Sequence, residues 1–227
     1  MKLCLSGFSQ GVEIVPGAVS VLEINDRVLF SRVGQSLFSE QGEQAIEPFC
    51  LFDDDQEEIS SRNAFLFITN PFDLPWSERT LIGKVIERME NMLLLDDDVR
   101  QEVESAGREV SEKVAALGFQ MRSDYSFDIE WDMRKYLKAF DFGVDVDPCD
   151  PLLDNLIRFL NLAADASFDR VLVFMNLKNF LAVHELEEFY QHAVFSERRI
   201  LLLENVHDDT FFEKENKMRI DQDLLES

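Results

Sequence analysis

Positive charge is scarce in this sequence. Its 227 residues include 22 Lys and Arg against 45 Asp and Glu, so the formal net charge is −23 at pH 7. A protein with this imbalance repels the phosphate backbone of nucleic acids over most of its surface. The composition therefore excludes a general basic coat, and any contact with DNA must be confined to a local patch.

Long apolar runs and paired cysteines are also missing. No stretch of 18 apolar residues occurs, and the N-terminal MKLCLSGFSQG lacks the apolar centre of a secretion signal. Cys4, Cys50 and Cys149 are scattered and form no CxxC pair, which is typical of a reducing cytosol. We therefore expect a soluble cytoplasmic protein with no membrane partner, and the cysteine spacing gives little support to zinc binding or a catalytic thiol.

The motifs of nucleotide enzymes and serine hydrolases are absent. The sequence contains no GxxxxGK[ST], GxGxxG or GxSxG, and Gly83-Lys84 is followed by Val85 within a helical pattern. The turn after the apolar residues 19–24 reads Asn25-Asp26-Arg27, without glycines whose amides could close around a phosphate. We expect no bound nucleotide.

The sequence does contain enough apolar residues for a large hydrophobic core, since 46% of the residues are hydrophobic and 20 are Phe. Short, continuously apolar runs predict strands at residues 19–24, 64–68, 171–175 and 200–203, with an edge strand at 218–224. Residues 27–39, 152–164 and 183–195 have apolar positions three or four apart, which predicts helices. Together they indicate the α/β class, with a mostly parallel sheet covered by helices.

The pattern changes to purely helical between the two halves of this α/β core. We place the core at residues 1–75 and 123–227 and the helical insertion at 76–122, with an alternative end at about 142. Ser77 is the expected N-cap of the first helix, the acids 96–98 interrupt the helical pattern, and Gly118 ends the second helix.

The second helix of the insertion carries a narrow apolar seam. Packing against the first helix is the preferred interpretation of the seam, and a contact between copies of the chain is the alternative. Its members are spaced by 4, 3, 4, 4 and 3 residues: Val99, Val103, Ala106, Val110, Val114 and Leu117.

A carboxylate cluster follows the insertion. In an extended segment, Asp128, Glu130 and Asp132 lie on one side and Ile129 and Trp131 on the other. Clustered carboxylate oxygens suit a hard cation such as Ca²⁺, although a strand with one solvated face has the same pattern. The glycine and terminal glutamate of an EF-hand loop are missing.

The order of these segments resembles the small CRISPR-associated adaptation protein of type II-A systems. The segments that carry the resemblance are VSVLEIND, LFSRVGQSLF, FDIEWDMRKYLKAFDFGVDV, LLDNLIRFL, DRVLVFMNLKNFLAVHELEEFY and RILLLEN. The resemblance implies a fold similar to P-loop ATPases but without a functional P-loop, and an inserted α-helical domain.

The same resemblance implies a function that is not enzymatic. Family members form a homotetrameric ring, bind the ends of linear double-stranded DNA without reading its sequence, and bind Ca²⁺ that supports the ring. They act in spacer acquisition, a step of antiviral defence, with the integrase complex and the effector nuclease. The family's acidic motif falls on Asp128, Glu130 and Asp132, whereas Met133 and Lys138 stand where members can have further acids. The number of calcium ions is left open.

The sequence also offers candidate DNA-binding cations in and after the insertion. Four subunits that direct the same basic flank inward would surround a duplex with positive charge, while ordinary ion pairs with neighbouring glutamates are the alternative interpretation. The candidates are Lys84, Arg88, Arg100, Arg108, Lys113, Arg134, Lys135 and Lys138.

Two other functions remain open from the residues alone. One is an acidic scaffold that binds proteins of the adaptation complex and has no physiological contact with DNA. The other is a metal-dependent nuclease or phosphatase that uses Asp128, Glu130 and Asp132, because paired metal ions held by carboxylates can cleave phosphodiesters.

Overall fold

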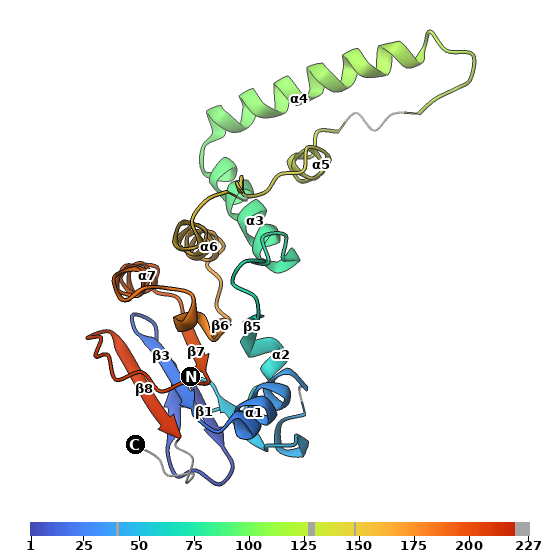
Figure 1. Ribbon diagram of the computed structural model, residues 1–227. Coiled ribbons are helices and arrows are strands. Elements are labelled where there is room, and N and C mark those ends of the chain that lie inside the picture. The colour runs from blue at the N-terminus through green and yellow to red at the C-terminus, as the bar shows by residue number, and fades with distance from the viewer. Residues whose placement is uncertain (40, 127–129, 148, 221–227) are drawn as a thin grey trace. The chain divides into compact units, whose positions relative to one another are not determined.

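A five-stranded parallel sheet forms the centre of the α/β core (Figure 1). Its strand order is β5-β6-β7-β3-β8, and every neighbouring pair is parallel. The computed structural model describes residues 1–39, 41–126, 130–147 and 149–220. The strands of this sheet are β3 (Val19–Ile24), β5 (Phe65–Ile68), β6 (Val171–Met175), β7 (Ile200–Glu204) and β8 (Glu215–Ile220).

Both faces of the parallel sheet are covered, which explains why β5 and β6 are apolar throughout. One face, which includes Leu22 and Leu203, packs with Val33 and Leu37 of helix α1 in a single buried cluster. On the other face, Phe174 of β6 meets Phe189 of helix α7 edge to face, with the ring centroids 5.7 Å apart. The helices of the core are α1 (Arg27–Ser39), α2 (Ser61–Ala64), α6 (Leu152–Asp165) and α7 (Val183–Phe195), with 3₁₀ turns η1 (Gly42–Gln44) and η2 (Leu177–Asn179).

A second, three-stranded sheet extends the first buried cluster. Its strands β1 (Lys2–Leu5), β2 (Gly11–Glu13) and β4 (Phe49–Phe52) are antiparallel in the order β2-β1-β4. Leu3 and Leu5 point inward and join the apolar cluster shared with the parallel sheet. This sheet was not predicted, because three or four residues give too short a stretch for a clear alternation.

The chain divides into two compact units. Unit 1 consists of Met1–Trp76 and Val146–Ser227 and contains both sheets, and unit 2 is Ser77–Asp145. Unit 2 holds the three helices α3 (Arg79–Leu95), α4 (Asp97–Gly118) and α5 (Met133–Ala139) among its described residues, and after α4 the chain turns back toward α5 (Figure 1). Within the described ranges, no helix combines the length and the hydropathy needed to cross a membrane.

The observed elements confirm the α/β class and most of the predicted strands and helices. The ranges 19–24, 171–175, 27–39 and 183–195 match the observed elements, and α4 ends at Gly118 as expected. The predicted cap at Ser77 is wrong, because the Glu78 side chain takes that position and accepts from the backbone N–H of Thr80. The edge strand lies earlier than predicted, at Glu215–Ile220, and residues 221–224 lie outside the described residues.

Unit 2 is held together by a close approach between α4 and the segment before α5. A Cβ atom added to Gly107 would lie 2.1 Å from the ring of Trp131, so only glycine fits there. Substituting Gly107 by alanine should therefore displace Trp131 and cost about 1–3 kcal/mol of stability.

The matched control is Gly83→Ala on α3, where an added Cβ meets nothing within 4 Å. This change should stabilise the protein by about 0.5–1 kcal/mol, because alanine favours the helix more than glycine does. Urea unfolding followed by Trp131 fluorescence, in a Trp76→Phe background, measures both variants. Equal stabilities for the two variants would contradict the Gly107–Trp131 contact.

Candidate functional site

Two of the three predicted calcium ligands are described, and Asp128 lies outside the described residues. Glu130 is exposed, and Asp132 caps α5: its Oδ1 accepts a hydrogen bond from the backbone N–H of Lys135 at 2.9 Å. Residues 130–132 form no strand, but Asp132 has the predicted extended backbone, with φ −135° and ψ 108°, as the N-cap of α5. Apart from the undescribed positions, no three His, Cys, Asp or Glu side chains come together to hold a metal ion.

Trp131 fixes this acidic segment to the rest of unit 2. Its ring lies against Gly107 of α4 and is followed by a ladder of aromatic rings on α5. The centroid distances are 5.0 Å from Trp131 to Tyr136 and 4.6 Å from Tyr136 to Phe140. Residues 130 and 132, on either side of Trp131, are therefore held next to α4 rather than on a free loop.

The predicted DNA-binding cations are largely paired with carboxylates. Lys138 is exposed, and Lys84 and Arg88 also take part in interactions within the protein. Five of the candidates form these ion pairs: Arg100–Asp97 at 2.6 Å, Arg108–Glu104 at 3.3 Å, Lys113–Glu109, Arg134–Glu90 and Lys135–Asp132 at 4.0 Å.

One of these pairs joins two helices of unit 2. The Arg134 guanidinium on α5 donates from Nε to Glu90 on α3 at 3.1 Å, and this hydrogen bond raises the pKa of Arg134. The pair borders an open cavity of about 630 Å³, which is also lined by Glu87, Arg100 and Glu104. The cavity therefore mixes both signs of charge, with more acids than bases.

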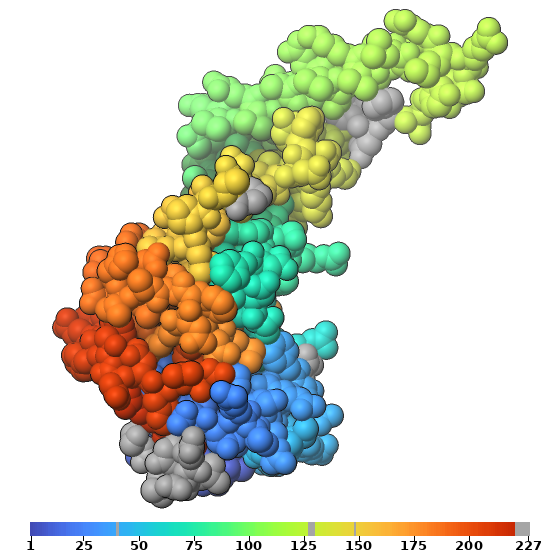
Figure 2. Space-filling model, viewed as in Figure 1, coloured from blue at the N-terminus to red at the C-terminus, as the bar shows by residue number. Residues whose placement is uncertain are grey.

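The apolar seam of α4 is mostly exposed. Val99, Val110, Val114 and Leu117 have exposed fractions of 44%, 60%, 42% and 56%. In the space-filling view, the light-green surface of α4 stays visible along the helix (Figure 2). The preferred interpretation, packing against the first helix of the insertion, is thus wrong for these four residues, because the flank of α4 that packs within unit 2 is the one that carries Gly107.

In unit 1, the carboxyl end of β3 lies where a P-loop would follow. The N-terminus of α1 already has an anionic partner there, since Asp26 Oδ1 accepts the backbone N–H of Leu29 at 2.7 Å. Helix N-termini bind phosphates through such amides. At this position the protein's own carboxylate takes the place of a phosphate oxygen.

Next to it, a buried lysine is surrounded by acids. The ammonium of Lys178, on the turn after β6, lies 2.7 Å from Glu215, 3.3 Å from Glu23 and 3.4 Å from Asp208. The Lys178 side chain is 8% exposed and that of Glu23 is fully buried. A charge buried this deeply is stable only with such partners, because an unpaired charge in the interior is strongly destabilising.

The edge strand β8 supplies further cations to the same network. Arg219 Nε lies 2.9 Å and Lys217 Nζ 3.3 Å from Glu23, while the backbone N–H of Lys178 donates to Glu204 Oε1 at 3.1 Å. We call this set the buried ion network: Glu23, Lys178, Glu204, Asp208, Glu215, Lys217 and Arg219.

Sequence reasoning missed the network, although a signal existed. Glu23 and Glu204 stand near the ends of otherwise apolar strands, in VSVLEIN and ILLLEN. A carboxylate inside a doubly covered strand requires a buried partner. The partners come from Lys178, Lys217 and Arg219, which only the fold brings to this end of the sheet.

Comparison with known proteins identifies the family. The family model "CRISPR-associated protein (Cas_Csn2)" matches residues 43–224. The chain belongs to this family. The crystal structure of Stu0660 of Streptococcus thermophilus has the same fold as this Cas_Csn2 chain, with a TM-score of 0.58 and 13% sequence identity over 97% of this chain and 74% of that chain. None of the curated proteins matches.

Family membership confirms the resemblance found in the sequence. The Cas_Csn2 chain is a type II-A CRISPR-associated protein with a role associated with CRISPR adaptation. The Stu0660 structure supports the fold alone, because the identity is low.

The buried ion network makes the stability of this Cas_Csn2 chain depend on pH. Burial raises the pKa of Glu204 from 4.5 to about 7. Between pH 4.5 and about 7, Glu204 is protonated in the folded state but has lost its proton in the unfolded state. The free energy of unfolding therefore falls as the pH rises through this range, by on the order of 3 kcal/mol in total.

The variant Glu204→Gln keeps an acceptor for the Lys178 amide but carries no charge. The free energy of unfolding of this variant should not fall over this pH range. At pH 8 it should exceed that of the unsubstituted protein. Urea unfolding between pH 5 and 8 measures both, with Glu187→Gln, an exposed position on α7, as the control. A parallel pH dependence for Glu204→Gln and the unsubstituted protein would refute this role of Glu204.

Proposed function

We propose that this Cas_Csn2 protein is a calcium-dependent, non-enzymatic homotetrameric ring of the cytoplasm that binds the ends of linear double-stranded DNA during spacer acquisition. Its partners are the integrase complex and the effector nuclease of the same CRISPR system. The observation that carries the proposal is the family match over residues 43–224. Features of unit 2 support its separate parts.

The acidic segment supports calcium binding. Trp131 holds Glu130 and Asp132 beside α4, so two oxygen ligands are positioned before a cation arrives. Asp132 uses Oδ1 for the helix cap, and its Oδ2 lies 4.0 Å from the ammonium group of Lys135, a distance at which a cation could compete for the oxygen. Asp128 would complete the set, and Ca²⁺ would relieve the repulsion among the three carboxylates.

The exposed seam of α4 supports assembly. Soluble proteins leave few contiguous apolar stripes open to water, and a stripe at seven-residue spacing fits a matching helix of another copy. Four copies related by closed symmetry would bury such stripes in repeated interfaces. This is the alternative interpretation of the seam, and it agrees with the exposure of Val99, Val110, Val114 and Leu117.

The ion pairs of α4 are compatible with DNA binding because they are exposed. The Lys113 and Glu109 side chains are 74% and 65% exposed, and exposed pairs contribute about 0–1 kcal/mol. A phosphate can replace such a carboxylate at little cost. Fourfold repetition would add these small patches together around a duplex, while the remaining acidic surface faces solvent.

A non-enzymatic role is supported by the composition of unit 2. Residues 77–145 contain no histidine and no cysteine, so the acidic segment has neither an imidazole base nor a thiol nucleophile in its own unit. Ca²⁺ accepts oxygen ligands in a flexible coordination geometry. In the proposed function it supports assembly and positioning and does not cleave phosphodiesters.

A second function has a specific observation in its favour. Several candidate cations are paired with carboxylates, as an acidic scaffold for protein partners would require. In that case DNA binding would be absent, and the exposed seam would receive a protein of the adaptation complex.

Calcium binding is tested with substitutions that preserve the helix caps. Asp132→Asn keeps an N-cap on α5 but removes a charge, so the affinity for Ca²⁺ in calorimetry should fall about tenfold or more, as it should for Glu130→Gln. The control Asp96→Asn makes the same change at the cap of α4, where Asp96 accepts from Val99 N–H at 3.1 Å. Equal affinities for the Asp132 and Asp96 variants would contradict the proposed ligands.

DNA binding is tested by a matched pair on α4. Lys113→Gln should weaken binding to a linear duplex and lower the slope of log affinity against log salt by about 3–4 units, since one phosphate contact contributes about 0.9 and the ring has four subunits. Glu109→Gln should strengthen binding, because it frees Lys113 and removes a negative charge. Mobility shifts over a salt series measure both. If neither change alters binding, the protein-scaffold function is favoured.

A further inference from the structure

Two cysteines face each other across the small antiparallel sheet of unit 1. Cys4 of β1 pairs in register with Cys50 of β4. The neighbouring Leu3 and Leu5 point into the core, so alternation places Cys4 and Cys50 together on the outer face, where both are half-buried. Cys149 is exposed and belongs to neither strand.

The backbone spacing at this pair permits a disulfide. Ser6 N–H donates to the carbonyl of Pro48 at 2.8 Å, so by alternation Cys4 and Cys50 form the next hydrogen-bonded pair. Opposed residues of such a pair have Cα atoms about 5.5 Å apart, within the roughly 4.4–6.8 Å of disulfides. Their Cβ atoms, about 4.5–5.5 Å apart, must move slightly closer, which would strain the disulfide. Strained disulfides are readily reduced.

Each of the two sulfurs has a different neighbour. Cys4 Sγ lies over Gly11 of β2, where an added Cβ would be only 2.9 Å from it, so the missing side chain makes room for the sulfur. Cys50 Sγ lies 3.9 Å from Glu43 Oε1. Rotation about χ1 of each cysteine turns the sulfurs toward the space between β1 and β4.

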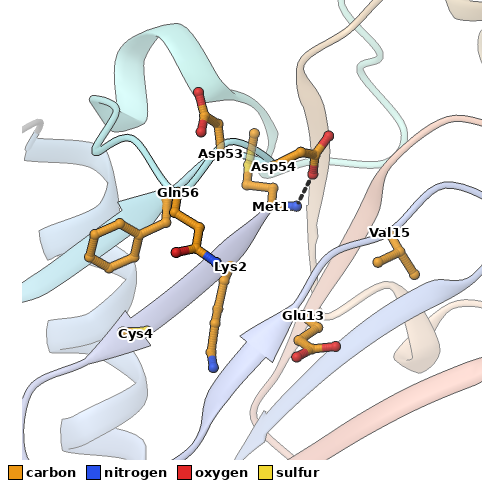
Figure 3. Close-up of a pocket in the computed structure, with 9 residues that line it drawn as sticks. Met1, Lys2, Cys4, Glu13, Val15, Asp53, Asp54 and Gln56 are labelled. Atoms are coloured by element: carbon orange, nitrogen blue, oxygen red, sulfur yellow. Dashed lines mark hydrogen bonds and ion pairs between the residues drawn. The ribbon is translucent and has the colours of Figure 1, made fainter.

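A small oxidant can reach Cys4 from solvent. Cys4 borders an open cavity of about 590 Å³ that Lys2, Glu13 and Asp54 also line (Figure 3). Lys2 lies on the same strand as Cys4, and its Cε also approaches Gly11.

We propose that Cys4 and Cys50 are a redox pair that forms a reversible cross-strand disulfide on reaction with a low-molecular-weight disulfide such as oxidised glutathione. The Cys4 thiolate attacks one sulfur of the oxidant, which forms a mixed disulfide and releases one thiolate. Cys50 then loses its proton to solvent and attacks Cys4 Sγ, which releases the second thiolate. Two protein thiols are oxidised, and one small disulfide is reduced to two thiols.

The surroundings fix the order of the two attacks. Burial raises the pKa of the Cys50 thiol, and the charges of Glu58 and Glu43 raise it further. Cys50 therefore stays protonated while Cys4, beside the open cavity, meets the oxidant first. The product joins β1 to β4 covalently, independently of calcium and DNA binding in unit 2.

The test uses the full chain in buffers of varied reduced to oxidised glutathione ratio, followed by acid quenching, alkylation and peptide mass analysis. The proposal predicts a linked Cys4–Cys50 peptide, two hydrogen atoms lighter than the separate peptides, which dithiothreitol converts back. Cys149→Ser should give the same linked peptide, and Cys50→Ser should leave Cys4 as a mixed disulfide with glutathione.

Thermal unfolding provides a second readout. The oxidised protein should unfold at a higher temperature than the reduced protein, and Cys50→Ser should show no such shift. The proposal is overturned if Cys4 and Cys50 stay alkylated, or carry glutathione separately, over the whole range of ratios in which Cys149 becomes glutathionylated.

Discussion

The burial of Glu23 at the carboxyl end of β3 is the interaction on which the core depends. A fully buried carboxylate in a sheet covered on both faces is tolerated only because Lys178, Lys217 and Arg219 surround it. These partners come from the turn after β6 and from the edge strand β8, so a single charge ties three parts of the sheet together. In nucleotide-binding α/β proteins this edge of the sheet receives the ligand. Here internal ion pairs, and the carboxylate of Asp26 at the start of α1, occupy it. In the proposed function, the core therefore serves as a support, and recognition lies in the inserted unit.

Much of that core could be predicted from the sequence because it follows from burial alone. Strands such as residues 171–175 are apolar on both sides, and helices such as residues 183–195 have an apolar face, so local patterns specify them. The buried ion network was not predictable in the same way. Glu23 and Glu204 are visible as acids in apolar strands, but their partners are more than 100 residues or a whole crossover away. Only the strand order β6-β7-β3-β8 brings them together.

Unit 2 shows a different limit of sequence reasoning. The seam of α4 was recognised from its spacing, but spacing cannot say which surface covers an apolar stripe. Gly107 marks a covered flank, because the ring of Trp131 fills the space where a side chain would be, whereas Val99, Val110, Val114 and Leu117 are exposed. Directly after Trp131, the Asp132 carboxylate is the N-cap of α5 rather than part of a strand. The ion pairs Arg108–Glu104 and Lys113–Glu109, in contrast, follow from helical spacing and were foreseen as the alternative to DNA contacts.

The proposed function requires a protein with a net charge of −23 to hold a polyanion, and closed symmetry is the feature that reconciles the two. The most direct test compares one DNA fragment as a linear duplex and as a covalently closed circle, in calcium and in chelator, by sedimentation with the free protein as reference. A preformed ring predicts that a tetramer binds the linear form in calcium, that the closed circle stays unbound, and that chelator abolishes binding. Equal binding of both forms, or binding of neither, would contradict a ring threaded by DNA ends.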